Sequence, residues 1–578
     1  MQFATVGDSS VLLAACVLLP FIGMLLGLLC AGRGLQRIVF VLLPVGLGLA
    51  VAIAAAWLET PGPLVYQLGG WPPPLGIALR ADGAAVAMLL ATAGVVGAIA
   101  LYARADFAAA SGSAGTRSAF AYWLLLLAVW GALNLVFVSG DLFTLYVALE
   151  LLTFAGVPLV CLAGSAETLR AALRYMLFAL CGSVLYLLGA VLLYGGYGTL
   201  DIPLLAAAVR PEPIAITALA LMTAGLLAKT ALFPLHIWLP PAHGGAPAAA
   251  SAVLSALVIK GSWFLVLRLW LDVMPGVASV SAAQLPAAMG AAAIVFGSVV
   301  ALRQQRLKLL VAYSTVAQIG YLFLLFPLAF DAAGEMAFAD VARTAGVLQA
   351  IAHATAKAGM FLAAGLIYAR LGHDRIDDLA GAARALPLAV VAFLIGGLAL
   401  MGVLPSGAYL AKKLLLASAD ESGQWWWTLV LQGGAAFTAA YVVLIGVRTL
   451  SRPAAPLRDL QPVSRLSQWA ALGLALTSLV LSLVAVWGPL PAELIANPLS
   501  PKELGNTLSM FALGALLAAA LARSPLLAPR TGPRGGVALL GLAFERGDRF
   551  VRRWPSAMLS LLVVAGACGW LLSAGAAK

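Results

Sequence analysis

Long apolar stretches, separated by short polar segments, occupy almost the whole chain. A helix that crosses the hydrocarbon layer of a membrane needs about 20 predominantly apolar residues. About sixteen stretches meet this requirement, at 10–30, 36–57, 82–103, 118–138, 141–163, 170–194, 213–239, 246–270, 283–302, 308–328, 341–370, 386–417, 425–447, 465–488, 505–523 and 556–574. The segments between them are too short for a separate soluble catalytic domain. The pattern therefore predicts an all-α polytopic membrane protein.

Basic residues gather in the loops that follow odd-numbered spans, whereas loops after even-numbered spans are mostly acidic. The positive-inside rule predicts this alternation and puts the basic loops in the cytoplasm. We therefore expect both chain ends on the periplasmic side of a bacterial inner membrane. The basic positions are Arg33, Arg37, Arg104, Arg117, Arg170, Arg174, Arg303, Arg306, Lys308, Arg370, Arg375, Arg384, Arg448, Arg452, Arg458, Arg465 and the arginines from Arg523 to Arg553.

Composition supports the same class of protein, because 63% of residues are hydrophobic and only 10% are charged. The net charge of +11 follows from the cytoplasmic loops and requires no nucleic-acid partner. The five cysteines lie in apolar stretches without CxxC spacing, so we predict no metal site, cofactor or bound redox centre. The N-terminus lacks the basic region of a signal peptide, which indicates that the first helix is retained.

Residues 533–555 differ from the spans, because arginines interrupt their apolar residues. This mixture is typical of a short amphipathic helix that lies on a membrane surface, here the cytoplasmic one. A plain basic loop is the alternative.

A few ionisable residues lie inside the predicted spans, where each charge costs several kcal/mol and calls for a functional explanation. His353 and Lys357 are separated by four residues, so they lie on one helix face. The full set is Glu150, Lys229, Lys260, His353, Lys357 and Lys412, with Lys413 next to the last.

Two of the charged spans contain helix breakers. Pro234 follows Lys229 and is itself followed by His236, and Pro405 precedes Lys412. Proline removes a backbone hydrogen bond, and in a bilayer the freed groups need protein or water partners. Broken helices beside buried charges, in two halves of one chain, indicate a transport site between repeats. The corresponding helices would be the fourth to eighth and the ninth to thirteenth.

These groups suit proton transfer. A buried ammonium releases its proton more readily than an exposed one, and a nearby carboxylate opposes that release. An ion pair between Glu150 and Lys229 would thus act as a switch, and His236 and His353 suit a relay between lysines. Static packing or ion pairing is the alternative, and Lys412 could instead extend to the membrane surface. We expect His243 in a loop.

Several motifs resemble the antiporter-like membrane subunits of respiratory complex I, Mrp-type cation/proton antiporters and membrane-bound hydrogenases. The resemblance covers about residues 80–450. It rests on the helix that bears Glu150 and on LLAKTALFPLHIWLPPAHGGAPAAASAVLSALVIK, LKLLVAYSTVAQIGYL, HATAKAGMFLAAG and LPSGAYLAKKLLL.

The resemblance implies fourteen core helices with two inverted five-helix repeats and broken helices, and about two extra C-terminal helices. It also implies a Glu150–Lys229 pair, a relay through Lys260, His353 and Lys357, and an exit at Lys412. We divide the chain into N-terminal helices (1–80), an antiporter-like core (81–450) and C-terminal helices with the amphipathic segment (451–578).

Lysine in the second broken helix and the lack of a long lateral helix favour an M/N- or D-type member. Such a member is a non-catalytic, proton-translocating subunit, coupled to redox chemistry or cation antiport. Its partners are the other membrane subunits of a complex I-like, hydrogenase-like or Mrp-like assembly, the lipid bilayer, and H⁺ with or without Na⁺. Two alternatives remain: an energising subunit for inorganic-carbon uptake and an independent transporter of an organic solute.

Overall fold

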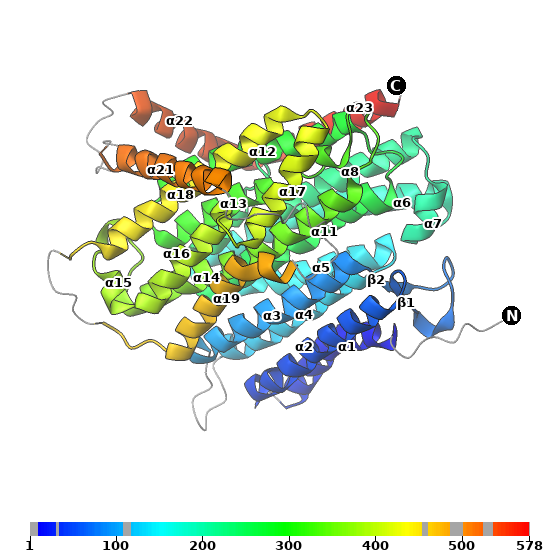
Figure 1. Ribbon diagram of the computed structural model, residues 1–578. Coiled ribbons are helices and arrows are strands. Elements are labelled where there is room, and N and C mark those ends of the chain that lie inside the picture. The colour runs from blue at the N-terminus through cyan, green and yellow to red at the C-terminus, as the bar shows by residue number, and fades with distance from the viewer. Residues whose placement is uncertain are drawn as a thin grey trace. The chain divides into compact units, whose positions relative to one another are not determined.

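The computed structural model describes residues 10–30, 34–107, 117–453, 460–485, 501–523 and 536–576. Its described part is almost entirely helical (Figure 1) and contains thirteen helices that are long and apolar enough to cross a membrane. The prediction of an all-α polytopic membrane protein is confirmed. An antiparallel hairpin of β1 (Leu64–Gln67) and β2 (Ala78–Ala81) is an addition that the apolar pattern did not predict, because both strands are very short.

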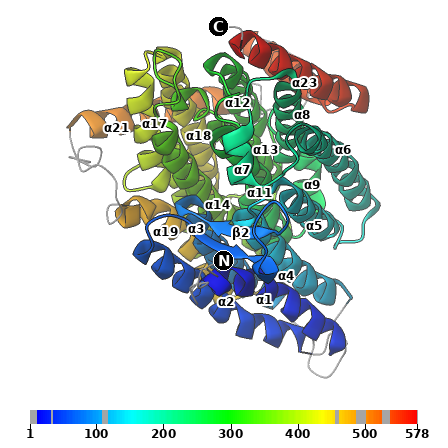
Figure 2. The same ribbon diagram turned by 90° about the vertical axis from the view of Figure 1, so that its right-hand side faces the viewer.

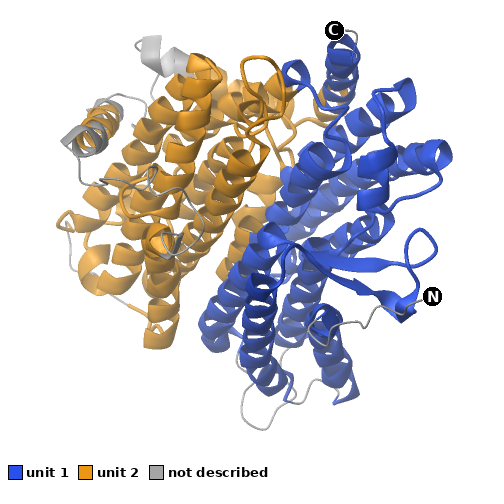
Figure 3. Cartoon of the chain, turned by 45° about the vertical axis from the view of Figure 1, so that its right-hand side comes forward, with its two compact units in different colours: residues 1–230, 257–282, 561–578 blue, residues 231–256, 283–560 orange. Residues whose placement is uncertain are grey.

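The chain forms two compact units, coloured separately in Figure 3. Unit 1 comprises residues 1–230, 257–282 and 561–578, and unit 2 comprises residues 231–256 and 283–560. Charged residues singled out in the sequence fall in both units.

Unit 1 packs its helices around the β1–β2 hairpin. Its helices are α1 (Val11–Leu29), α2 (Leu35–Glu59), η2 (Leu68–Gly70), α3 (Gly83–Asp106), α4 (Arg117–Val138), α5 (Leu142–Val160), α6 (Ala166–Tyr197), α7 (Ile202–Ala208), α8 (Pro213–Thr230), α11 (Ile259–Arg268), η4 (Leu269–Val273) and most of α23 (Trp554–Ala576).

Unit 2 is helical throughout its described residues. Its helices are α9 (Leu239–Gly245), α10 (Ala248–Val253), α12 (Val280–Leu302), α13 (Leu307–Tyr321), η5 (Pro327–Ala329), α14 (Ala339–Leu371), η6 (Ile376–Asp378), α15 (Ala382–Ala385), α16 (Pro387–Met401), α17 (Gly407–Glu421), α18 (Trp425–Leu450), α19 (Arg465–Ala485), α21 (Pro501–Arg523) and α22 (Gly536–Val551). The π-helical turn η3 (Leu254–Val258) spans the boundary between residues 256 and 257.

Both predicted helix breaks are present. The span at 213–239 ends as a helix at Thr230, and Ala231 adopts a left-handed backbone conformation (φ 59°). The span at 386–417 divides into α16 and α17. In the second break, the carbonyl of Pro405 accepts hydrogen bonds from the hydroxyl (2.5 Å) and amide (3.3 Å) of Ser482 in α19. Protein atoms thus satisfy a backbone group that the break exposes, as a bilayer requires.

Two other segments refine the predicted elements. The span predicted at 308–328 is a shorter helix, α13, which ends at Tyr321 and leads into turns. The amphipathic segment predicted at 533–555 contains the helix α22 rather than a plain loop. Residues 1–9 and 577–578, which form the chain ends, lie outside the described residues, as do Arg33 and Arg458 of the basic loops.

Candidate functional site

Glu150 and Lys229 form a buried ion pair in unit 1. The Lys229 Nζ lies 2.9 Å from the Glu150 Oε1, and their side chains are 6% and 15% exposed, respectively. The hydroxyl of Ser183 in α6 lies between them, accepting a hydrogen bond from Lys229 and donating one to Glu150. The pair predicted from the sequence is therefore present, with a serine that the sequence analysis did not identify.

Close packing of α6 and α8 brings Ser183 and Lys229 together. The two helices run side by side in Figures 1 and 2. A Cβ atom at Gly182 would lie 2.5 Å from the carbonyl oxygen of Gly225 and 3.1 Å from the Lys229 Cγ. Such separations are too short for a side chain, so glycine is required for this approach.

Lys229 also borders a small cavity of about 10 Å³, lined on its other sides by Thr153, Tyr175 and Ser262 among others. This volume is close to that needed for one water molecule. Ser262 lies on α11, two residues after Lys260, which is fully buried. Lys260 itself follows the π-helical turn η3, a distortion that is frequent at functional sites.

His353 and Lys357 lie one turn apart on α14 in unit 2, and both are fully buried. The Lys357 Nζ donates hydrogen bonds to the hydroxyl of Ser314 and to the carbonyl of Val311 (3.4 Å), both on α13. Among the described residues, no carboxylate forms an ion pair with Lys357. Its environment thus differs from that of Lys229.

His236, in the segment between α8 and α9, pairs with Asp548 rather than with another of the predicted site residues. The His236 Nε2 lies 3.0 Å from the Asp548 Oδ1, and both groups are buried. Asp548 also accepts a hydrogen bond from the hydroxyl of Tyr313 (2.7 Å) and pairs with Arg552 (2.8 Å).

Asp548 is the main residue that the sequence analysis missed. Its only sequence signal is an acidic residue within the basic segment 533–555. Burial raises the pKa of Asp548, but the hydrogen bond from His236, the charge of Arg552 and the hydrogen bond from Tyr313 outweigh burial and lower it below its ordinary value. The carboxyl group is therefore ionised at neutral pH.

The helix α22 that carries Asp548 is held on unit 2 by further contacts. Glu545 pairs with Arg303 at 2.6 Å, and the ring of Phe544 lies 5.6 Å from that of Phe296. These contacts bring α22 against α12, so its acidic side chains face protein rather than solvent.

The expectation that His243 lies in a loop is wrong. His243 belongs to the short helix α9, is fully buried, and stacks on Phe361 of α14 with ring centroids 4.7 Å apart. Lys308 is also buried and donates a hydrogen bond to the carbonyl of Ala246. Within the described ranges, no group of three His, Cys, Asp or Glu side chains could hold a metal ion.

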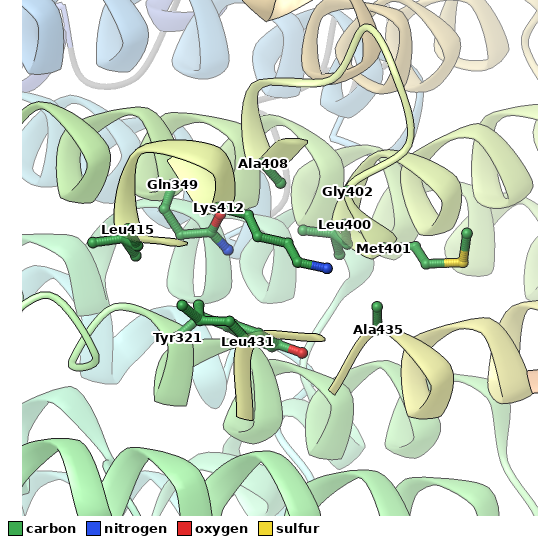
Figure 4. Close-up of a pocket in the computed structure, with 10 residues that line it drawn as sticks. All are labelled: Tyr321, Gln349, Leu400, Met401, Gly402, Ala408, Lys412, Leu415, Leu431 and Ala435. Carbon is green, nitrogen blue, oxygen red and sulfur yellow. The ribbon is translucent and has the colours of Figure 1, made fainter. Parts of the chain in front are cut away.

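Lys412 lines a cavity of about 20 Å³ beside the second helix break, together with Tyr321 and Gln349. Figure 4 shows the Lys412 amine and the Tyr321 hydroxyl pointing into this space. Lys413 instead lies over the ring of Tyr409, with its Nζ 5.9 Å from the centroid. Of the two adjacent lysines, Lys412 therefore faces the cavity, which is large enough for about one water molecule.

The sequence matches one protein family over more than half its length. Residues 139–438 match the model described as "NADH:quinone oxidoreductase/Mrp antiporter, TM". The NADH-quinone oxidoreductase subunit N of Desulforudis audaxviator (strain MP104C) is 35% identical over 372 residues, which cover 64% of this chain and 71% of that protein. A Na(+)/H(+) antiporter subunit of Alkalihalophilus pseudofirmus is 28% identical over 410 residues, covering 70% and 79%.

A solved structure shares the fold. A chain of the Mrp complex from Dietzia sp. DQ12-45-1b superposes with a TM-score of 0.71 at 24% identity, covering 89% of this chain and 99% of that one.

Proposed function

The chain belongs to the NADH:quinone oxidoreductase/Mrp antiporter membrane-subunit family, and from this premise we propose that it is a proton-translocating subunit of a multisubunit membrane complex. The complex would be of the complex I, hydrogenase or Mrp type, with transport coupled to redox chemistry or to cation antiport. The named relatives are a subunit N of an NADH-quinone oxidoreductase and a membrane subunit of a Na(+)/H(+) antiporter.

The observation that carries this proposal is the buried chain of Glu150, Ser183 and Lys229. While Glu150 is ionised, it favours the charged form of Lys229. Protonation or displacement of Glu150 removes this attraction, and the lysine then releases its proton. The cavity between Lys229 and Ser262 provides a place for a water molecule to receive it.

The other buried groups supply further steps of the same path. We assign Lys260, His353 and Lys357 to a central relay, because each is fully buried and can gain and lose a proton. Lys412 is the exit group, since its amine faces a cavity of its own.

His236 belongs to the path as a histidine of fixed orientation. Its Nε2 faces the Asp548 carboxylate, so this nitrogen carries a proton when the ring is neutral. The Nδ1 is buried and has no hydrogen-bond partner in the described chain, which leaves it as the nitrogen that accepts and returns the transported proton. Asp548 acts through His236 and is therefore a positioning residue.

The proposal includes an arrangement of the chain in a bacterial inner membrane. The antiporter-like core with its two inverted repeats spans residues 81–450, between N-terminal helices (1–80) and C-terminal helices (451–578). Both chain ends face the periplasm. In support, Gly575 near the end of α23 packs on Ser279, just beyond η4. The end of η4 and the start of α3 are joined because Arg268 pairs with both Asp272 and Asp82.

The test is proton pumping by membrane vesicles that contain the whole complex, in Na⁺-free buffer and with Na⁺ added. Glu150→Gln should abolish pumping while the complex remains assembled, because the neutral amide cannot switch Lys229. The matched control is Glu167→Gln, the same change at an exposed position in the first turn of α6. Normal pumping by an assembled Glu150→Gln complex would contradict the proposal, and pumping only with Na⁺ present would make Na⁺ a transported ion.

A further inference from the structure

A large open pocket of unit 2 lies apart from the buried charges. Its volume is about 500 Å³, far larger than the cavities beside Lys229 and Lys412. It is lined by the end of α14, the start of α16 and the segment that leads into α19. These three helices pack against one another. Because each is a predicted membrane span and each has an end at the pocket, the pocket lies at the level of the membrane surface.

Two arginines give this pocket a positive charge that no protein carboxylate neutralises. Arg370 closes α14 and Arg465 opens α19. Arg370 donates one hydrogen bond to the carbonyl of Gln461 (2.7 Å), and its buried Nε has no acceptor among the described residues. Neither arginine forms an ion pair within the part of the chain that the structure describes.

The nearby carboxylates already have other partners. In the turn that follows α14, Asp374 pairs with Arg306 (3.0 Å), Asp377 with Arg448 (3.1 Å) and Asp378 with Arg375 (3.1 Å). The acidic residues of this end of unit 2 are thus engaged, and the charge of Arg370 and Arg465 remains available to an external anion.

The rest of the lining is apolar or suited to the membrane surface. Leu386, Leu388 and Val463 form apolar walls. The indole of Trp469, one turn into α19, is 57% exposed at the rim. Tryptophan is enriched at the level of lipid headgroups, and basic pockets between membrane helices bind acidic headgroups.

We propose that this pocket binds one anionic phospholipid. Its phosphate lies between Arg370 and Arg465, and its acyl chains pass over the apolar walls beside Trp469. The guanidinium groups recognise the phosphate, because their planar array of N–H donors matches phosphate oxygens. A free phosphate ion shares the first interaction only, so the acyl chains distinguish the two ligands.

The experiment measures binding of short-chain dihexanoyl phosphatidylglycerol to the purified, delipidated complex, by thermal shift and by native mass spectrometry. Dihexanoyl phosphatidylcholine tests the need for net negative charge, and inorganic phosphate at the same concentration tests the need for acyl chains. We expect stabilisation and one tightly retained lipid with phosphatidylglycerol, and no comparable effect of the other two ligands.

Two variants locate the site. Arg465→Gln changes an exposed residue, so its folding should be unaffected, and it should weaken phosphatidylglycerol binding roughly tenfold through loss of a charge-assisted hydrogen bond. The double variant Arg370→Gln/Arg465→Gln should abolish the retained lipid. Arg375→Gln, the same change at an exposed arginine that does not line the pocket, should bind as the unaltered protein does.

Equal stabilisation by phosphatidylcholine would overturn the proposal, because it would show that charge is not recognised. Undiminished lipid retention in a folded Arg465→Gln protein, or equal loss in Arg375→Gln, would also overturn it. An equal effect of inorganic phosphate would show an anion site without lipid specificity and would refute the lipid assignment. None of these outcomes depends on proton pumping.

Discussion

Lys229 and Lys357 are both buried lysines, but their partners differ. Lys229 contacts a carboxylate and a hydroxyl, whereas Lys357 contacts a hydroxyl and a carbonyl. An ammonium group with a carboxylate partner keeps its proton, and one without such a partner gives it up more easily. The contrast suits a path along which protons move away from the Glu150–Lys229 pair.

Replacement of Lys357 tests whether titration or charge matters. Lys357→Ala should abolish proton pumping by the assembled complex, since no group at this position could then carry the proton. Lys357→Arg should also impair pumping, because a guanidinium hardly ever releases its proton. Pumping by membrane vesicles is the measurement. Full activity of Lys357→Arg would instead indicate a static electrostatic role.

The adjacent lysines of α17 offer a matched comparison. Lys412→Ala should reduce pumping to the level of vesicles without the complex, because it removes the amine that faces the cavity. Lys413→Ala should leave pumping near normal, because this side chain lies over the Tyr409 ring. If the two variants exchanged these effects, Lys413 would be the exit group.

At the scale of elements, the separation of α6 and α8 controls the ion pair. Gly182→Val should force these helices apart, at a cost of about 1–3 kcal/mol typical of overpacking. It should abolish pumping by separating Ser183 from Lys229. Gly195→Val, also in α6, is the control, because a Cβ atom there meets nothing within 4 Å. Thermal unfolding and pumping should be measured on both variants, and equal losses would exclude a specific effect of the helix approach.

The docking of α22 should depend on pH through Asp548. The pKa of Asp548 is lowered in the folded protein, so its ionised form stabilises docking at any pH above the ordinary carboxyl value of about 4. Stabilisation is lost only as the pH falls below that value. Hydrogen exchange of α22, corrected for intrinsic rates, should therefore remain slow from pH 8 to 5. Asp548→Asn should exchange faster over that whole range, and a wild-type transition near pH 6 would point to another group.

At the scale of the whole molecule, the placement of basic loops predicts the orientation in the membrane. A reporter that is active only in the cytoplasm should be inactive when fused after Lys578. The same reporter inserted beside Arg375, in a predicted cytoplasmic loop, should be active and serves as the control. Activity at Lys578 would mean that the number of spans differs from sixteen by an odd number.

The amino-acid sequence alone determined the spans, the two helix breaks and the set of buried ionisable residues. These features depend on local properties, namely the length of apolar runs and the missing N–H of proline. All sixteen predicted spans overlap helices of the structure, and Glu150 and Lys229 were paired in advance on the basis of cost and family resemblance.

Only the tertiary structure decided which side chains meet. Ser183 lies between Glu150 and Lys229 because two glycines allow close helix packing. Asp548 meets His236 across 312 residues of sequence. Hydrophobic length is a property of one segment, whereas the direction in which a side chain points depends on how its helix packs against others. For that reason the sequence revealed the charged groups of the path, and the folded protein revealed their partners.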